Sequence, residues 1–175
     1  MQTLKIGFIG FSGSGKTTLA LEAGKRGYRS VDTDTMFCEM HGLSPDELIL
    51  SGRESDFRML EMKTVKKAID GDIRIIAFGG GIHFGNPVYR EIAGSDTKLI
   101  FLRGSFKNLL DRASGRPMFE MLGEDGYRKL FEERQELYMR ASDFVVDVDG
   151  KSITELFVEV ENIWNLLFQR NLKQS

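Results

Sequence analysis

The sequence predicts an α/β fold in which helices cover both faces of a parallel β-sheet. Short apolar segments of strand length alternate with longer segments of helical length, and several of the apolar segments are almost uninterrupted. Such continuous apolar segments are typical of parallel strands that are buried on both faces. Right-handed crossovers between parallel strands place helices on both sides of the sheet. We therefore expect a three-layer α/β/α sandwich that binds its ligands at the carboxyl ends of the strands.

The elements follow one another in regular alternation. Strands are predicted at residues 4–9, 28–31, 74–78, 98–102 and 144–148. Helices are predicted at residues 16–25, 54–69, 105–112, 126–141 and 152–169. Two helix starts match a capping box, in which a serine and a glutamate three residues later cap each other's backbone amides. These pairs are Ser44 with Glu47, where Pro45 takes the first helical position, and Ser152 with Glu155.

The composition is that of a soluble protein without a general affinity for nucleic acid or membranes. The chain has 175 residues, and 24 Lys and Arg against 26 Asp and Glu give a net charge of −2. We expect a single domain over residues 1–175, because roughly 100 to 200 residues are typical of one domain. A nearly neutral charge argues against a dedicated nucleic-acid binder. No apolar run approaches the roughly 20 residues of a membrane helix and no signal peptide begins the chain, so we expect a cytoplasmic protein.

Cysteine and histidine are too scarce to stabilise the fold or to form a metal site by themselves. Cys38 is the only cysteine, which excludes an intrachain disulfide, and we expect it to be a small buried apolar residue. His41 and His83 are the only histidines, and we expect them at the surface or in loops. The stability of the fold must therefore come from its hydrophobic core.

Residues 10–17, with the sequence GFSGSGKT, match the pattern G-x-x-x-x-G-K-[ST] in full. The pattern follows a predicted strand and begins a predicted helix, as a phosphate-binding loop requires. Backbone amides and the helix dipole surround a polyphosphate in such a loop, while Lys16 reaches the outer phosphates and the Thr17 hydroxyl can bind Mg²⁺. The alternative, a glycine-rich turn between strand and helix, explains neither the lysine nor the hydroxyl. The motif therefore predicts nucleotide binding.

Other segments distinguish between classes of nucleotide-binding proteins. The guanine-reading pattern N-K-x-D of small GTPases is absent from the sequence. A motor ATPase would usually have a long apolar strand that ends in an acidic residue, whereas the strand predicted near 73–78 ends in Gly79, Gly80 and Gly81. Three glycines leave backbone amides accessible and allow a ligand to approach closely. This pattern favours a kinase for small molecules, and we expect a small ligand to bind at the glycines.

Two carboxylates, Asp32 and Asp34, follow the strand predicted at 28–31 and should lie beside the phosphate-binding loop. We predict that Asp32 faces the Mg²⁺ shell and that Asp34 faces the hydroxyl that is phosphorylated. An Asx turn or a helix N-cap supplied by Asp34 is the structural alternative. The two residues alone do not decide between these interpretations.

Two arginines are candidates for binding an anionic substrate. Glu61 lies three residues after Arg58 on the helix predicted at 54–69, so its carboxylate can hold one edge of the guanidinium while the other edge binds an anion. An exposed ion pair is the alternative interpretation. The same two interpretations apply to Arg134, which lies among several glutamates.

Taken together and in order, these segments resemble the shikimate kinases. The resemblance spans nearly the whole chain and rests on the phosphate-binding loop, extended to Thr18, and on a series of short motifs. The motifs are Asp32-Thr33-Asp34, Phe57-Arg58 with Glu61, Gly79-Gly80-Gly81, Leu102, Arg116-Pro117, and Arg134 with Tyr138, Ala141 and Asp143. The resemblance implies a sheet of five parallel strands of the nucleoside-monophosphate-kinase type.

The resemblance implies ATP-dependent phosphorylation of the 3-hydroxyl of shikimate, with Mg²⁺ as the cofactor. The implied nucleotide-binding residues are Gly13, Ser14, Gly15, Lys16, Thr17, Thr18, Arg112 and Arg116. The implied shikimate-binding residues are Asp34, Arg58, Gly79, Gly80, Gly81 and Arg134, of which the two arginines would hold the carboxylate. The implied metal ligands are Thr17 and Asp32, and the implied catalytic residues are Lys16, Asp34 and Arg116.

The resemblance also divides the chain into functional segments. A helical segment at about 34–62 would bind the acceptor, and a lid at about 112–123 would carry Arg116 to the ATP phosphates and Arg112 to the adenine. The sequence departs from the family pattern at Cys38, where an acidic residue is usual, and only residues 113–115 separate the two lid arginines.

Three functions are consistent with these observations. Shikimate kinase is the leading prediction, and a related kinase for another small hydroxy acid, such as gluconate, is the first alternative. A regulatory protein that binds ATP without phosphoryl transfer is the second, supported by Cys38 and the short lid. We expect a monomer whose last helix packs on the sheet, and a dimer contact through that helix is the alternative.

Overall fold

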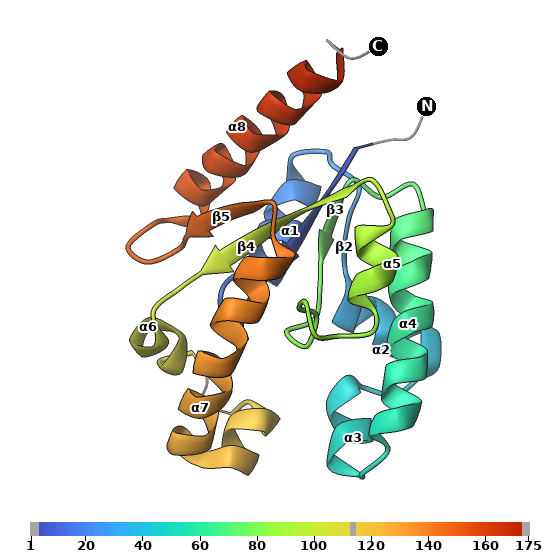
Figure 1. Ribbon diagram of the computed structural model, residues 1–175, viewed down its shortest axis with the longest axis vertical. Helices are drawn as coiled ribbons and strands as arrows, with labels where there is room; N and C mark the ends of the chain where they lie inside the picture. The colour runs from blue at the N-terminus through green and yellow to red at the C-terminus, as the bar shows by residue number, and fades with distance from the viewer. Residues whose placement is uncertain (1–3, 113–114, 173–175) are drawn as a thin grey trace.

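The fold has the three layers that the sequence predicts, as the computed structural model shows for residues 4–112 and 115–172 (Figure 1). Five parallel strands in the order β2-β3-β1-β4-β5 form the sheet. The strands are β1 (Lys5–Ile9), β2 (Ser30–Asp32), β3 (Ile75–Ala77), β4 (Thr97–Arg103) and β5 (Phe144–Asp147). The helices are α1 (Lys16–Lys25), α2 (Thr33–His41), α3 (Pro45–Leu50), α4 (Glu54–Asp70), α5 (Tyr89–Ala93), α6 (Phe106–Leu110), α7 (Pro117–Ala141) and α8 (Ile153–Leu172).

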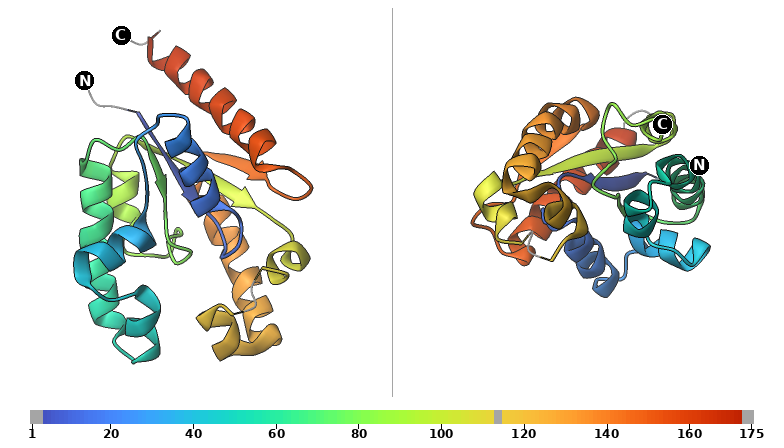
Figure 2. Two further views of the ribbon diagram at one scale, coloured as in Figure 1. Left: turned by 180° about the vertical axis from the view of Figure 1, so that it is seen from behind. Right: turned by 90° about the horizontal axis from the view of Figure 1, so that it is seen from below.

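Two hydrophobic cores, one on each face of the sheet, connect the layers. Helices α1 and α8 cover one face, where Leu19 and Phe157 are fully buried (Figure 2). Helices α4, α5 and α7 cover the other face, where Phe101 and Tyr138 are buried. The central strand β1 is buried along its whole length, and its Ile6 pairs with Ile75 of β3 and Lys98 of β4. A central strand buried on both faces explains the uninterrupted apolar segments in the sequence.

The helix starts follow local sequence signals. At α3, the Ser44 hydroxyl accepts a hydrogen bond from the backbone N–H of Glu47 at 3.1 Å, and the Glu47 carboxylate accepts one from the N–H of Ser44 at 2.6 Å. The same reciprocal pair, formed by Ser152 and Glu155, precedes α8. Both predicted capping boxes are therefore confirmed.

Three helices differ from the prediction. Helix α7 consists of two pieces, because Gly123 (φ 67°, ψ 177°) is not helical; the piece from Pro117 to this kink was not predicted, and the second piece contains the helix predicted at 126–141. The short helices α2 and α5 were not predicted, since neither has a long apolar periodicity. Cys38 lies on α2 and is exposed, so the expectation that it is buried is wrong. Its neighbour Phe37 takes the inward position on this helix, and successive residues on a helix point about 100° apart.

Two helical segments extend beyond the carboxyl ends of the strands (Figure 1). One consists of α2, α3 and the first turns of α4, which pack around a small core of Phe37, Leu48 and Phe57. The other is the first part of α7, before the kink at Gly123. These segments flank the end of the sheet where parallel α/β proteins bind ligands.

No helix within residues 4–112 and 115–172 is both long and apolar enough to cross a lipid bilayer.

The core on the α8 side makes a measurable contribution to stability. Replacing the fully buried Phe157 by alanine should lower the free energy of unfolding by about 3 to 5 kcal/mol, because it leaves a cavity under α8. The matched control is Phe168→Ala on the same helix, where the side chain is 54% exposed and the expected change is within about 0.5 kcal/mol. Urea unfolding followed by circular dichroism measures both changes. Equal losses for the two variants would contradict the packing described for α8.

Candidate active site

Residues 10–15 form the loop between β1 and α1, and Lys16 and Thr17 are the first residues of α1, as the motif predicts. Gly15 precedes α1 with a φ of 95°, a left-handed conformation that favours glycine. The buried Lys16 folds back over the loop, where its Nζ donates hydrogen bonds to the carbonyl oxygens of Gly10 at 2.8 Å and Phe11 at 3.0 Å. The loop therefore presents a lysine ammonium and the amino end of a helix at one place, which is the arrangement that binds phosphate.

The charges of the other predicted site residues act on Lys16. Burial lowers the pKa of Lys16 to about 8, and the carboxylates of Asp34 and Asp32 oppose this shift. The guanidinium groups of Arg116 and Arg134 lower the pKa of Lys16 further. The fold therefore brings two carboxylates and two arginines from distant parts of the sequence into the surroundings of the loop.

Asp32 connects the phosphate-binding loop to α2. Its Oδ2 accepts a hydrogen bond from the Thr17 hydroxyl at 2.6 Å. Its Oδ1 accepts hydrogen bonds from the backbone N–H groups of Asp34 at 2.9 Å and Thr35 at 3.1 Å, which makes Asp32 the N-cap of α2. The sequence alternative assigned this cap to Asp34 and was wrong, because β2 continues to Asp32 and α2 begins at Thr33. The carboxylate of Asp34 is therefore left free of the capping role.

The carboxylate of Asp34 lies directly against Gly79, the first glycine after β3. A Cβ atom at Gly79 would lie 2.6 Å from Asp34 Oδ1, so only glycine permits this approach. The backbone N–H of Gly79 donates to the Thr33 hydroxyl at 3.0 Å, which ties the start of α2 to the end of β3. Asp34 is exposed to solvent overall, but its carboxylate is surrounded by protein. This burial of the carboxylate raises the pKa of Asp34 to about 6, and the negative charge of the Asp32 carboxylate raises it further.

The second glycine, Gly80, contacts both α7 and the phosphate-binding loop. Its carbonyl oxygen accepts hydrogen bonds from Arg134 Nη1 at 3.1 Å and from the hydroxyl of Tyr138. Burial of Tyr138 raises the pKa of its phenol to about 12, so the hydroxyl keeps its proton and acts as a donor. A Cβ at Gly80 would lie 3.7 Å from the backbone nitrogen of Ser12 in the phosphate-binding loop. The second glycine thus contacts the loop on one side and α7 on the other.

Arg58 lies beside Gly81, the third glycine. A Cβ at Gly81 would lie 3.3 Å from Arg58 Nη1, and the same nitrogen donates to Glu61 Oε2 at 2.8 Å. The Glu61 side chain is only 9% exposed, which excludes the alternative of a fully exposed ion pair. Burial raises the pKa of Glu61, and the Arg58 guanidinium opposes this shift. Asn86 Nδ2 donates to the Gly81 carbonyl at 2.7 Å and extends toward Glu61 Oε2 at 3.5 Å.

The pKa of His83 is affected by the two arginines that lie near the glycines. Its Nδ1 accepts a hydrogen bond from the backbone N–H of Gly85 at 3.2 Å. Burial lowers the pKa of His83 to about 4, with further contributions from Arg134 and Arg58. Both arginines therefore lie near enough to act on one imidazole, although they belong to different helices.

Arg112 and Arg116 also contact the phosphate-binding loop. Arg112 Nη1 donates to the Gly13 carbonyl at 3.1 Å, and Arg116 Nη1 donates to Ser12 Oγ at 2.6 Å. Arg116 Nε donates to the carbonyl of Arg112 at 2.8 Å, so the two arginines support each other. Residues 113 and 114 of the predicted lid lie outside the described residues.

Many of these residues line a cavity of about 440 Å³. Its lining includes the loop from Ser12 to Thr18 together with Asp32, Asp34, Gly80, Arg112 and Arg116. The rest of its wall comes from Phe78, at the end of β3, and from the connection between β5 and α8, with Val148, Lys151, Ile153 and Leu156. The wall from β5 and α8 was not predicted, because no motif distinguishes its apolar residues from ordinary core positions.

Ser12 and Asn86 were not predicted as site residues either. The loop motif accepts any residue at position 12, so the motif does not signal a contact with Arg116. The Asn86-Pro87 pair is a turn signal, but a turn signal does not show that the amide reaches a glycine carbonyl. Both contacts join segments far apart in the sequence, and they become visible only in three dimensions.

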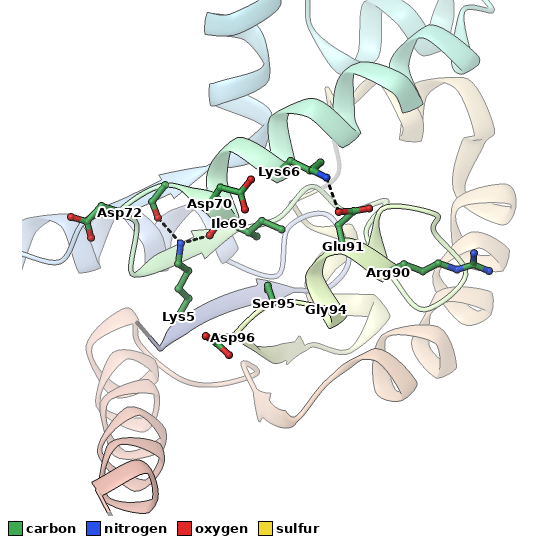
Figure 3. A pocket seen from close by; sticks show the side chains of 11 residues that line it. Lys5, Lys66, Ile69, Asp70, Asp72, Arg90, Glu91, Gly94, Ser95 and Asp96 are labelled. Atoms are coloured by element: carbon green, nitrogen blue, oxygen red, sulfur yellow. Dashed lines mark hydrogen bonds and ion pairs between the residues drawn. The ribbon is translucent and has the colours of Figure 1, made fainter. Parts of the chain in front are cut away.

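A second cavity, of about 780 Å³, lies at the opposite end of the sheet (Figure 3). It is lined by Lys5 at the start of β1 and by Asp96 just before β4. Lys5 donates to the carbonyl oxygens of Ile69 and Gly71 at the end of α4, which caps that helix. These contacts are structural, and none of the predicted site residues lines this cavity.

Comparison with known proteins agrees with this geometry. A family model described as shikimate kinase matches residues 12–164. A curated shikimate kinase of Caldanaerobacter subterraneus subsp. tengcongensis is 33% identical over 156 residues, which are 86% of this chain and 90% of the relative.

Solved structures agree on the fold. A shikimate kinase from Acinetobacter baumannii in complex with shikimate has a TM-score of 0.79 and 20% identity, and the match covers 98% of this chain and 97% of that chain. A gluconokinase from Sinorhizobium meliloti has a TM-score of 0.56 and 19% identity, over 95% of this chain and 97% of that chain. The fold is the nucleoside-monophosphate-kinase type expected from the sequence. The match of the family model over most of the chain decides the family: this protein belongs to the shikimate kinases.

Proposed function

We propose that this protein transfers the terminal phosphoryl group of ATP to the 3-hydroxyl of shikimate, producing shikimate 3-phosphate and ADP. One observation supports the proposal most directly: each of the three consecutive glycines after β3 has one of the side chains of Asp34, Arg134 and Arg58 as a neighbour. The second of these glycines, Gly80, lies against the phosphate-binding loop, so an acid bound there would have its hydroxyl near the nucleotide. Phosphoryl transfer depends mainly on such alignment and on neutralising the charge of the phosphates.

The two arginines are the groups that would bind the carboxylate of the acceptor. A planar guanidinium can form two parallel hydrogen bonds to a carboxylate, which fixes a small rigid acid better than a lysine ammonium. Arg58 is held by the buried Glu61, and Arg134 is held by the Gly80 carbonyl. Each arginine is thus fixed at one edge, and we assign its other edge to the substrate.

We assign the hydroxyl of the acceptor to Asp34. Its carboxylate lies at Gly79, next to the loop that contains Lys16. In the proposed reaction the hydroxyl oxygen forms a bond to the terminal phosphorus, the bond to the leaving ADP oxygen breaks, and Asp34 accepts the hydroxyl proton. The amides near Gly80 and Gly81 would complete the acceptor pocket, and Gly79, whose N–H is bonded to Thr33, would line it with its backbone.

We assign the nucleotide to the phosphate-binding loop. Its phosphates would be bound by backbone amides and hydroxyls of Gly13, Ser14, Gly15, Thr17 and Thr18, together with Lys16 and Arg116. Arg112 would lie against the adenine, and its contact with the Gly13 carbonyl supports this assignment because it orients the guanidinium toward the loop. Lys16, Asp34 and Arg116 are the proposed catalytic residues.

Thr17 and Asp32 fit a Mg²⁺ ion that accompanies ATP. The Thr17 hydroxyl and Asp32 Oδ2 are 2.6 Å apart, which offers two oxygen ligands at the edge of the phosphate site. Mg²⁺ prefers oxygen ligands and is usually held by one or two side chains together with the phosphates. When bound, the ion neutralises charge on the phosphates.

The segments named from the sequence retain their proposed roles. Residues at about 34–62 would surround the acceptor, since they include α2, α3 and the half of α4 that carries Arg58. Residues at about 112–123 would form a lid over the nucleotide. We further propose that the protein is a single domain and a monomer, located in the cytoplasm, where ATP is available.

Shikimate-dependent formation of ADP tests the function directly. A coupled assay with ATP and Mg²⁺ should show turnover with shikimate well above the rate without an acceptor. Gluconate in parallel distinguishes the related kinase, and ATP binding without turnover on either acceptor would support the regulatory alternative. A rate with shikimate equal to the background would reject the proposed function.

Lys16→Ala should abolish turnover, because it removes the ammonium group that neutralises the phosphates during transfer. The expected loss in kcat is at least about 100-fold, in the range seen when one catalytic electrostatic group is removed. The matched control is Lys25→Ala at the exposed end of the same helix, which should keep the wild-type rate. A Lys16 variant with near-normal kcat would remove this residue from the catalytic assignment.

Arg58→Ala should chiefly weaken acceptor binding. Loss of one partner of a desolvated anion costs about 2 to 5 kcal/mol, which predicts an increase of at least about 30-fold in the KM for shikimate. The matched control is Arg53→Ala. Arg53 lies at the N-cap position of the same helix and pairs at 2.9 Å with Asp56, three residues later, but this ion pair is exposed to solvent. Steady-state kinetics with shikimate as the varied substrate measures both variants. An unchanged KM in the Arg58 variant would exclude its proposed contact with the acceptor.

A further inference from the structure

Position 12 of the phosphate-binding loop makes a side-chain contact that the loop motif does not require. Ser12 is half-buried, and its Oγ accepts a hydrogen bond of 2.6 Å from Nη1 of Arg116. The two residues are 104 positions apart in the sequence. Because the donor is a permanently charged guanidinium, the hydrogen bond belongs to the stronger, charge-assisted class.

Arg116 makes a second hydrogen bond through another nitrogen of the same guanidinium. Its Nε donates to the carbonyl of Arg112 at 2.8 Å, and Arg112 in turn donates to the Gly13 carbonyl. Arg116 is thus held at two points, one on its own segment and one on the loop. Within the described residues, Ser12 is the side chain of the loop that holds it.

A buried phenol completes the surroundings of Ser12. The hydroxyl of Tyr127 is buried and has no hydrogen-bond partner in the described part of the chain. Its ring is fixed by edge contacts with Phe11 and Phe119 at centroid distances of 4.8 and 5.3 Å. Burial raises the pKa of Tyr127, and the nearby Ser12 hydroxyl acts in the opposite direction. Because Phe11 is the chain neighbour of Ser12, the Tyr127 ring packs beside this position of the loop.

We propose that Ser12 is a positioning residue for phosphoryl transfer: its hydroxyl holds the Arg116 guanidinium beside the phosphate-binding loop, ready for the phosphates of ATP. Arg116 keeps this hydrogen bond when ATP binds and offers its remaining N–H groups to the phosphates. The catalytic role of Arg116 rests on the proposed function. The role of Ser12 in ATP binding can be tested without an acceptor, because it requires only that the protein binds ATP.

This arrangement lowers the entropic cost of placing Arg116. A free arginine side chain has many rotamers, and ordering it at the moment of binding costs free energy. A guanidinium already held beside the phosphates avoids part of this cost, which is the general benefit of preorganisation. The loss of Ser12 should therefore appear in nucleotide binding and in kcat, while the KM for the acceptor should not change.

A double-mutant cycle between Ser12 and Arg116 tests the proposal. Calorimetry measures the affinity of a non-hydrolysable ATP analogue with Mg²⁺ for the wild type, Ser12→Ala, Arg116→Ala and the double variant. Ser12→Ala should weaken binding about 5-fold to 12-fold in the presence of Arg116, as expected when a long arginine side chain must be ordered on binding. In the Arg116→Ala background the same change should have less than about a 2-fold effect, because the partner is absent.

A conservative variant separates the hydroxyl from the fold of the loop. Ser12→Thr keeps the hydroxyl and should stay within about 3-fold of the wild type in analogue affinity and in kcat. Ser142→Ala, at the far end of α7, is the control for loss of a serine hydroxyl outside the site and should leave both quantities unchanged.

Three results would overturn the proposal. Equal effects of Ser12→Ala with and without Arg116, or no effect in either background, would show that Ser12 does not position Arg116. A Ser12→Thr variant as impaired as Ser12→Ala would show that the hydroxyl is not the operative group. Because these readouts need no acceptor, a wild type inactive on shikimate would reject the function without deciding the role of Ser12.

Discussion

The candidate active site depends on the absence of side chains at the end of one strand. After β3, three glycines allow the Asp34 carboxylate, the Arg134 guanidinium and the Arg58 guanidinium to approach the same stretch of backbone. A single Cβ at Gly79 would displace the carboxylate. The charged groups at these glycines come from α2, α4 and α7, so the bare backbone acts as the common surface on which three separate helices place their groups.

Much of the fold was predictable from the sequence, because local and tertiary preferences agree. The apolar segments that became β1 and β4 are long and buried on both faces, and the capping serines at α3 and α8 mark their helix starts. Helix α2 was missed because its nine residues begin directly at the end of β2 and bury only Thr33 and Phe37. The same connection explains why the capping role belongs to Asp32: β2 ends one residue later than predicted, and the cap lies two residues before Asp34.

The site was predictable where a motif specifies residue types and unpredictable where two distant side chains meet. Lys16 and Thr17 follow from the chemistry of phosphate binding, and Arg58 and Arg134 were placed at the acceptor through the family resemblance. Periodicity could not show that Glu61 is buried, that Asn86 reaches a glycine carbonyl, or that Ser12 meets Arg116. These contacts depend on how loops cross the end of the sheet, and loop paths have no periodic signal in a single sequence.

Helix α7 serves both halves of the proposed reaction. Arg116 lies at the N-cap position of α7 and contacts the phosphate-binding loop. Arg134 lies after the kink at Gly123 and contacts the backbone of Gly80. The kink divides the helix into two parts with separate partners. Substitutions or length changes before Gly123 should therefore alter the contact of Arg116 with Ser12 and leave the contact of Arg134 with Gly80 in place.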